Sequence, residues 1–171
     1  LWDYDIAAPP ILTSIKIENN FIDVVVVPTK TGNTFILNRD DGTPFFNINY
    51  SIAPSSDVPG EITSKYQIDR DLPEPLIKFV LEKKDITEKA ENDYKFSKKT
   101  SEYFKFGWFE TPSLKKTLLL YGLHGGAQWT GGAINPYNQD LFIPVNQVPW
   151  KIRLFYTSEE NHPNHLNKEY N

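Results

Sequence analysis

The sequence predicts an all-β chain built as blades of a β-propeller, and three observations lead to that prediction. Short apolar and β-branched runs recur with the pattern of half-buried strands at Ile11 to Ile17, Phe21 to Val27, Thr34 to Asn38 and Leu118 to Tyr121. Turn-forming residues separate neighbouring runs. No helical crossover lies between them, which argues against a parallel sheet. Repeated antiparallel units joined by turns favour a propeller, and a β-sandwich is the alternative.

The strands expected in the first third of the chain form one meander. Asn19-Asn20 is the turn between the first two runs, and Lys30 to Asn33 turns the chain toward the third. Asp40-Asp41-Gly42 follows the third run and has the Asp-Gly chemistry of a tight hairpin turn. Phe45 to Ile48 is expected to be the fourth strand. Residues 1–50 are therefore assigned to a first blade region.

Residues 51–113 are expected to form a long insertion of irregular and helical structure. Proline interrupts the first part of it repeatedly, at Pro54, Pro59, Pro73 and Pro75. The stretch from Phe79 to Tyr103 is rich in Lys and Glu and free of Gly and Pro, so a helix is expected over about Thr87 to Phe104. Its charges are expected to lie on a solvated face.

The β pattern returns in residues 114–157, which are assigned to further blade strands. Besides the run at Leu118, strands are expected at Leu141 to Val145 and at Ile152 to Tyr156. A glycine-dense run from Gly125 to Gly132 lies among them, and glycine at this density allows the backbone to approach another group closely. Residues 158–171 are expected to be a polar tail.

The composition excludes several classes of protein. With a net charge of −4 and no basic stripe, the chain is not expected to bind nucleic acid. No apolar run approaches the roughly 20 residues that cross a bilayer as a helix. The absence of cysteine excludes disulfides, thiolate catalysis and zinc–thiolate sites. The sequence does not begin with methionine, so we expect it to be part of a longer polypeptide that encodes the rest of the functional site.

Six stretches of the chain, taken in order, resemble signatures of the quinoprotein dehydrogenases that use pyrroloquinoline quinone (PQQ). They are Leu1-Trp2-Asp3-Tyr4-Asp5, Pro28-Thr29-Lys30-Thr31-Gly32-Asn33, Asn38-Arg39-Asp40-Asp41-Gly42-Thr43-Pro44, Thr111-Pro112-Ser113-Leu114, Gly125-Gly126-Ala127-Gln128-Trp129-Thr130-Gly131-Gly132-Ala133-Ile134-Asn135-Pro136 and Leu141-Phe142-Ile143-Pro144-Val145-Asn146. The glucose-dehydrogenase branch is more similar than the methanol branch, because its members carry a lysine at the place of Lys30. The resemblance covers most of residues 1–157.

This resemblance implies an eight-bladed propeller, of which the chain would supply about three blades and an insertion. It also implies PQQ in a central funnel, together with calcium or another divalent metal. The substrate would be an aldose or an alcohol that gives a hydride to the quinone. A quinone or a cytochrome would then accept the electrons. Such enzymes face the bacterial periplasm, and the remaining blades of the parent chain would complete the fold.

Asp3 and Lys30 are the candidate catalytic residues. The resemblance implies that Asp3 is the general base, which takes the hydroxyl proton as the substrate carbon loses hydride. Asp3 can also contribute to the oxygen shell of the metal, whose other ligands would lie upstream of Leu1. Lys30 would stabilise the negative charge that the quinone gains and would pair with the carboxylates of the cofactor. The alternatives are a turn aspartate and a surface lysine in a turn.

Trp129 and Asn146 are further candidates for binding the cofactor. Trp129 lies among glycines, so it would form a wall close to the planar cofactor or pack between blades. The resemblance places a cofactor-binding asparagine at Asn146, whose amide would bond to the quinone edge, and the alternative is a turn-capping residue.

These observations favour a fragment of a PQQ-dependent dehydrogenase over two other kinds of protein. A non-catalytic propeller scaffold would need neither Asp3 nor Lys30 in its motif. A carbohydrate-binding module could use Trp108 and Trp129 to stack on sugars, but would not need a carboxylate and a cation at this spacing. We expect the isolated chain to bind PQQ weakly or not at all, to be inactive and to self-associate through exposed strand edges.

Overall fold

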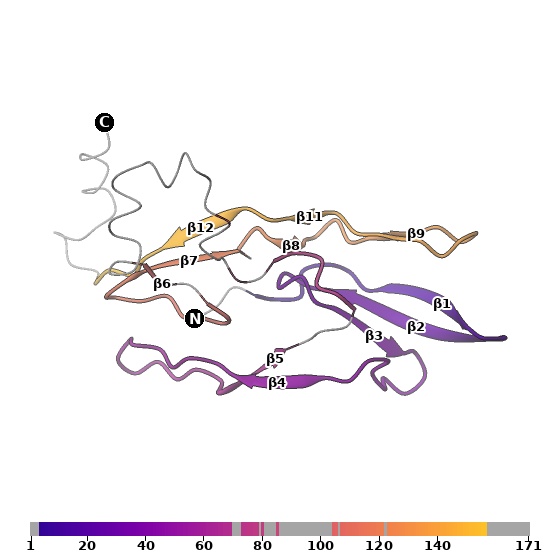
Figure 1. Ribbon diagram of the computed structural model, residues 1–171, viewed down its shortest axis with the longest axis horizontal. Coiled ribbons are helices and arrows are strands. Elements are labelled where there is room, and N and C mark those ends of the chain that lie inside the picture. The colour runs from indigo at the N-terminus through magenta and orange to yellow at the C-terminus, as the bar shows by residue number, and fades with distance from the viewer. Residues whose placement is uncertain are drawn as a thin grey trace.

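The computed structural model describes residues 4–69, 73–78, 80, 85, 104–105, 107–121 and 123–156. All regular structure in these ranges is β, and it comprises twelve strands arranged in five small sheets (Figure 1). The expectation of an all-β chain is therefore confirmed for the part that the structure describes. No helix in that part is long and apolar enough to cross a membrane.

The first sheet is an antiparallel meander of β1 (Ile11–Ile17), β2 (Asn20–Pro28) and β3 (Thr34–Asn38). The bounds of β1 and β3 are those that the sequence predicts, and β2 extends the predicted run by one residue at each end. Alternate side chains of β2 face the interior, and Val24 and Val26 are 0% and 3% exposed. This alternation fixes the face of the sheet that is buried.

The fourth strand expected at Phe45 to Ile48 does not form. The chain returns beside β3 through the Leu37↔Pro44 bridge and through main-chain hydrogen bonds at its edges. The Asn38 amide donates to the Thr43 carbonyl (2.8 Å) and the Phe45 amide donates to the Ile36 carbonyl (2.8 Å). Pro44 has no amide hydrogen, so the ladder cannot continue through it. The next strand is β4 (Asn49–Ile52), which belongs to a different sheet.

The insertion is more regular than the sequence indicates. β4 pairs with β5 (Tyr66–Asp69) in a two-stranded antiparallel sheet, where an irregular excursion was expected. The helix expected at Thr87 to Phe104 lies outside the described residues except for Phe104, which begins β6 (Phe104–Lys105). β6 runs parallel to β7 (Thr117–Tyr121). The division of the chain into two blade regions, an insertion and a tail stays a prediction.

The last third of the described chain is one long antiparallel hairpin in three segments (Figure 1). β7 pairs with β12 (Pro149–Ile152), β8 (Gly126–Ala127) with β11 (Val145–Asn146), and β9 (Ala133–Ile134) with β10 (Leu141–Phe142). The predicted strand at Leu141 to Val145 is thus divided, and the one expected at Ile152 to Tyr156 begins and ends earlier.

The breaks in this hairpin arise from extra residues in its first half. From the Tyr121↔Pro149 pair to the Gly126↔Asn146 pair, the first half advances five positions while the second advances three. From Ala127↔Val145 to Ala133↔Phe142, the corresponding advances are six and three. Extra residues on one strand bulge out of the ladder, and most of them belong to the glycine-dense run.

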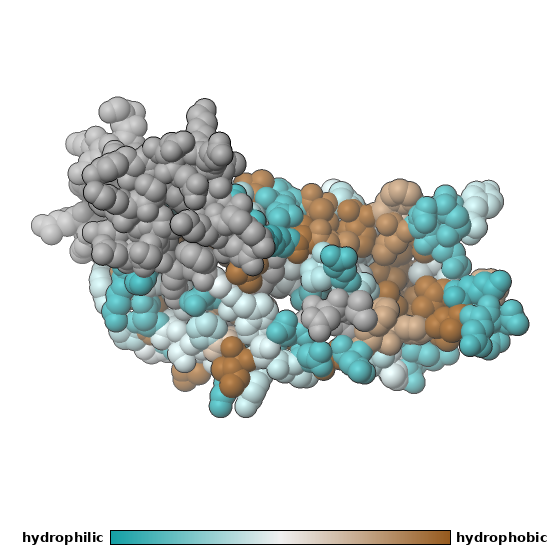
Figure 2. Space-filling model, viewed as in Figure 1, coloured by the Kyte–Doolittle hydropathy of each residue, from teal (hydrophilic) through white to brown (hydrophobic). Residues whose placement is uncertain are grey.

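The long hairpin packs on the first sheet. A Cβ added to Gly131 would lie 2.7 Å from the Pro9 ring, and one added to Gly132 would lie 2.8 Å from Ile11, so only glycine permits this approach. Most of β7 is buried, and Leu119 and Tyr121 form a core cluster with Ile77. Figure 2 shows hydrophobic surface along the hairpin, where Phe142 is 61% exposed.

Candidate functional site

Lys30 lies in a tightly bonded turn between β2 and β3. The Thr29 amide donates to the Asn33 carbonyl (3.0 Å), the Gly32 amide donates to the Thr29 carbonyl (3.0 Å), and the Thr29 hydroxyl also donates to the Asn33 carbonyl (2.8 Å). Gly32 has φ +83°, which an L residue rarely adopts. Thr29 to Gly32 are all buried. The backbone at Lys30 is therefore fixed by its own turn.

The glycine-dense run holds this turn from one side. The Ala127 amide donates to the Thr29 carbonyl (3.0 Å). Gly126 has φ +60°, and a Cβ at this position would lie 2.1 Å from the Lys30 carbonyl oxygen. The close approach that the glycines predict is thus an approach to the backbone of the candidate lysine.

The insertion holds the same turn from a second side. The Leu76 amide donates to the Gly32 carbonyl (2.8 Å), and a Cβ at Gly32 would lie 2.5 Å from the Ile77 side chain. Segments far apart in the sequence therefore meet at the Lys30 turn and position it.

The Lys30 side chain pairs with Asp5. Its Nζ lies 2.5 Å from Asp5 Oδ1, and the two side chains are 8% and 57% exposed. A buried ammonium is costly unless it is paired, so this contact keeps the charge of Lys30 inside the fold. Sequence reasoning selected Asp3 and missed Asp5, because the contact joins segments whose proximity only the fold reveals. Asp3 lies outside the described residues, so its distance from Lys30 stays a prediction.

A pocket of about 340 Å³ adjoins this ion pair. It is lined by Tyr4, Asp5, Ile6, Thr29, Thr31, Asn33, Phe35, Gln67, Ile68 and Phe109. Burial raises the pKa of the Tyr4 hydroxyl, so this phenol stays neutral over the physiological range. The Tyr4 and Phe109 rings meet edge to face with centroids 5.5 Å apart. The pocket therefore combines the carboxylate that pairs with Lys30 with aromatic and hydroxyl walls, whereas Lys30 itself does not line it.

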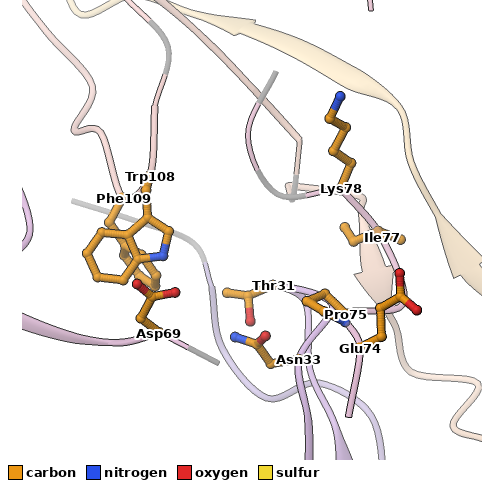
Figure 3. A pocket seen from close by; sticks show the side chains of 9 residues that line it. All are labelled: Thr31, Asn33, Asp69, Glu74, Pro75, Ile77, Lys78, Trp108 and Phe109. Atoms are coloured by element: carbon orange, nitrogen blue, oxygen red, sulfur yellow. The ribbon is translucent and has the colours of Figure 1, made fainter. Parts of the chain in front are cut away.

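A second pocket, of about 360 Å³, is also lined by residues of this turn (Figure 3). Thr31, Asn33 and Phe109 line both pockets. Phe109 is buried and has φ +51°, an uncommon conformation for a bulky residue. Strained backbone of this kind concentrates at functional sites, which makes the wall between the pockets a candidate for such a role.

Neither Trp129 nor Asn146 lines these pockets. Trp129 is 80% exposed on a turn closed by the hydrogen bond from the Gly131 amide to the Gln128 carbonyl (3.0 Å). Asn146 is exposed on β11, and its partner across the ladder is Gly126, which touches the Lys30 backbone. Their roles in binding PQQ stay predictions.

A metal site was expected to involve Asp3, which the structure does not describe. Among the residues that it does describe, no group of three or more His, Cys, Asp or Glu side chains could hold a metal ion. The metal role of Asp3 stays a prediction.

Comparisons with known proteins identify the family. The family model described as "PQQ: Glucose/ethanol/alcohol dehydrogenase, beta-propeller domain" matches residues 1–171. Quinoprotein glucose dehydrogenase of Gluconobacter oxydans is 28% identical over 90% of this chain and 19% of its own length. Quinoprotein glucose dehydrogenase A of Acinetobacter calcoaceticus is 30% identical over 90% of this chain and 20% of its own length. Quinate/shikimate dehydrogenase (quinone) of Acinetobacter baylyi is 26% identical over 94% of this chain and 20% of its own length.

The chain thus spans about a fifth of the length of these relatives. No solved structure matches it. The family match extends over the whole chain, and its β-propeller description agrees with the antiparallel sheets of the structure. The chain therefore belongs to the family of PQQ-dependent glucose, ethanol and alcohol dehydrogenases and is part of their β-propeller domain.

Proposed function

We propose that this chain supplies the Lys30 side of the cofactor site in a PQQ-dependent dehydrogenase that oxidises an aldose or an alcohol. The main support is the pairing of the buried Lys30 ammonium with Asp5, a residue that lines a pocket. A lysine in a surface turn would have no comparable constraint, and Lys30 is held by contacts from two other segments.

The residues around Lys30 fit the chemistry of this cofactor. PQQ carries three carboxylates and quinone oxygens, all of which accept hydrogen bonds from an ammonium. When bound, it accepts the hydride that the substrate carbon releases. Lys30 would pair with its oxygens, and the shielded position of the ammonium strengthens that interaction relative to water. Asp5 would share the ammonium and keep it aimed at the pocket.

Asp3 is proposed as the general base that removes the hydroxyl proton of the substrate. It lies two positions before Asp5 in the same motif. Calcium or another divalent metal is proposed as a second cofactor, with Asp3 as one oxygen ligand and the others upstream.

Trp129 and Asn146 are proposed to contact PQQ. We also propose a periplasmic location, electron transfer to a quinone or a cytochrome, and completion of the funnel by the remaining blades.

The substrate class is proposed from the relatives. Their names specify glucose, glycerol and quinate or shikimate, all of which carry several hydroxyl groups. We therefore propose a polyhydroxylated substrate or an alcohol.

The test is reconstitution of the intact protein that contains this chain. Given PQQ and calcium, it is expected to reduce a dye with D-glucose or ethanol as electron donor. Lys30→Gln is expected to lower kcat by about 10²–10³-fold, as loss of a preorganised charge does. Lys16→Gln, at an exposed position of β1, is the matched control and should leave the rate unchanged. Equal rates of dye reduction in both variants would show that Lys30 has no role in the cofactor site. Failure of the wild type to bind PQQ would favour the scaffold alternative.

A further inference from the structure

The second pocket presents hydrogen-bonding groups from separate segments of the fold. Thr31 and Asn33 come from the turn after β2, Asp69 from the end of β5, Glu74 from the insertion and Trp108 from the segment before β7. Figure 3 shows Trp108 and Asp69 on one side, Glu74 on the other, and the polar ends of Thr31 and Asn33 facing one another between them. Four segments thus contribute to one concave site.

Three of these groups retain hydrogen-bonding capacity. Asp69 accepts from the Ser51 hydroxyl through Oδ2 (2.6 Å), and its Oδ1 has no partner among the described residues. Among the residues that the structure describes, neither the side-chain amide of Asn33 nor the indole nitrogen of Trp108 makes a hydrogen bond. The pocket therefore offers a carboxylate acceptor, an indole donor and an amide that both donates and accepts.

The aromatic wall of the pocket is held in place. The Trp108 and Phe109 rings meet with centroids 4.7 Å apart at an interplanar angle of 63°, and Phe109 in turn packs against Tyr4. Phe109 is 8% exposed, so it gives Trp108 a fixed backing. A ring supported in this way presents a flat surface with little loss of conformational freedom when a ligand binds.

This chemistry selects among ligand classes. Asp69 and Glu74 disfavour an anion, and the Lys78 ammonium is already 2.6 Å from Asp85. An apolar ligand would leave the carboxylate, the amide and the indole nitrogen without partners, which is costly. A polyhydroxylated ligand satisfies them, because each hydroxyl both donates and accepts, while its carbon skeleton covers the Trp108 ring.

We propose that this pocket binds a polyhydroxylated molecule and that Trp108, Asp69 and Asn33 select it. The pocket shares Thr31, Asn33 and Phe109 with the pocket beside Lys30, so its ligand lies against the same turn as the candidate cation. The inference deepens the proposed function and rests on it for any effect on turnover. Binding of the ligand does not require the cofactor.

The experiment measures binding of D-glucose to the intact protein without added PQQ, by isothermal titration and saturation-transfer NMR. D-glucose is expected to bind, ethanol to bind much more weakly because it has one hydroxyl, and tetramethylammonium not to compete. Trp108→Ala and Asp69→Asn are each expected to weaken the glucose Kd by about tenfold or more. Asp69→Asn keeps an oxygen that can accept from Ser51, so it tests the site even if Trp108→Ala fails to fold.

Two variants serve as matched controls. Tyr137→Ala removes an aromatic ring that is 96% exposed, and Asp40→Asn neutralises an exposed carboxylate, both outside the pocket. Each should leave the glucose Kd within about twofold of wild type. This change is far smaller than the roughly tenfold weakening that is expected when one interaction in the pocket is lost. No glucose binding, unchanged binding in both pocket variants, or displacement of glucose by tetramethylammonium would overturn the proposal.

The outcome also separates this inference from the dehydrogenase proposal. If glucose binds through Trp108 but no dye is reduced with PQQ, the pocket stands and the proposed activity fails. If dye is reduced and Trp108→Ala leaves both the glucose Kd and the KM unchanged, the activity stands and the pocket assignment fails.

Discussion

Asp5 and Lys30 form a pair in which one partner is far more buried than the other. Removal of Asp5 would leave a shielded ammonium without this partner, whereas removal of Lys30 would leave a carboxylate that water can solvate. The two single substitutions should therefore have unequal costs, and the asymmetry identifies Lys30 as the residue that depends on the pair.

A double-mutant cycle of Asp5→Asn and Lys30→Gln measures this dependence. We expect a coupling free energy of unfolding of about 1–2 kcal/mol, below that of a fully buried pair because Asp5 is half exposed. The Arg39–Asp23 pair, with side chains 44% and 41% exposed, is the matched control and should couple by less than about 0.5–1 kcal/mol. Equal coupling in urea unfolding of the two cycles would show that burial of Lys30 contributes nothing.

Asp41 gives a prediction on pH. The Thr43 amide donates to Asp41 Oδ1 (2.8 Å), and this hydrogen bond holds the pKa of the carboxyl below its ordinary value. A depressed folded pKa means that the stabilisation is present above the unfolded pKa and is lost as the pH falls through the folded one. The unfolding free energy of Asp41→Asn should therefore fall less at acid pH than that of the wild type. Identical pH profiles of urea unfolding below about pH 4 would contradict this assignment.

At the scale of elements, the contact of β8 with the turn after β2 is the feature that positions the candidate site. Gly126→Ala should cost about 2–4 kcal/mol of unfolding free energy, because it combines left-handed backbone strain with overlap of the Lys30 carbonyl. Gly42→Ala is the control, since Gly42 has φ +75° but nothing within 4 Å of an added Cβ. It should show the strain alone, about 1–2 kcal/mol. Similar losses of unfolding free energy in the two variants would mean that the Lys30 turn shifts to make room for the added methyl group on β8.

The elements that the sequence predicts well are those defined by local pattern. β1 and β3 have the predicted bounds because their apolar residues alternate between clear turn signals. The division of Leu141 to Val145 was not predictable, because it follows from extra residues on the opposite half of the hairpin. The β4–β5 sheet was missed because the prolines between its strands suggested irregular structure, although Tyr50 and Ile52 alternate with polar neighbours.

The candidate site was predictable only in part for a similar reason. Lys30 could be found from its motif, since a signature is a local feature of the sequence. Its partner Asp5 and the pocket residues Asn33 and Asp69 depend on which segments the fold brings together. Trp108 was considered for sugar stacking together with Trp129, and only the structure separates them, because Trp108 lines a pocket and Trp129 does not.

At the scale of the whole molecule, the apolar surface of the long hairpin predicts association of the isolated chain. Phe142, Val145 and Val148 are 61%, 43% and 48% exposed, and exposed apolar patches of this kind mark interaction surfaces (Figure 2). The isolated chain should therefore show a mass in light scattering that rises with concentration. Phe142→Lys and Val145→Lys together should reduce it, whereas Tyr137→Lys, at the turn of the same hairpin, should not. A concentration-independent monomer would refute the expectation.

The turn that carries Lys30 is located mainly by main-chain hydrogen bonds and by glycine, and the Thr29 hydroxyl adds a hydrogen bond within the turn itself. Gln67 and Phe35 line the pocket from β5 and β3 and lie outside the turn itself, so we expect variants at these positions to leave the cation in place. A library of variants at these two wall positions would alter which molecules fit while the ammonium stays where it is. The position of charge and the shape of the cavity are thus separately adjustable properties of this chain, which makes it a practical starting point for changing specificity.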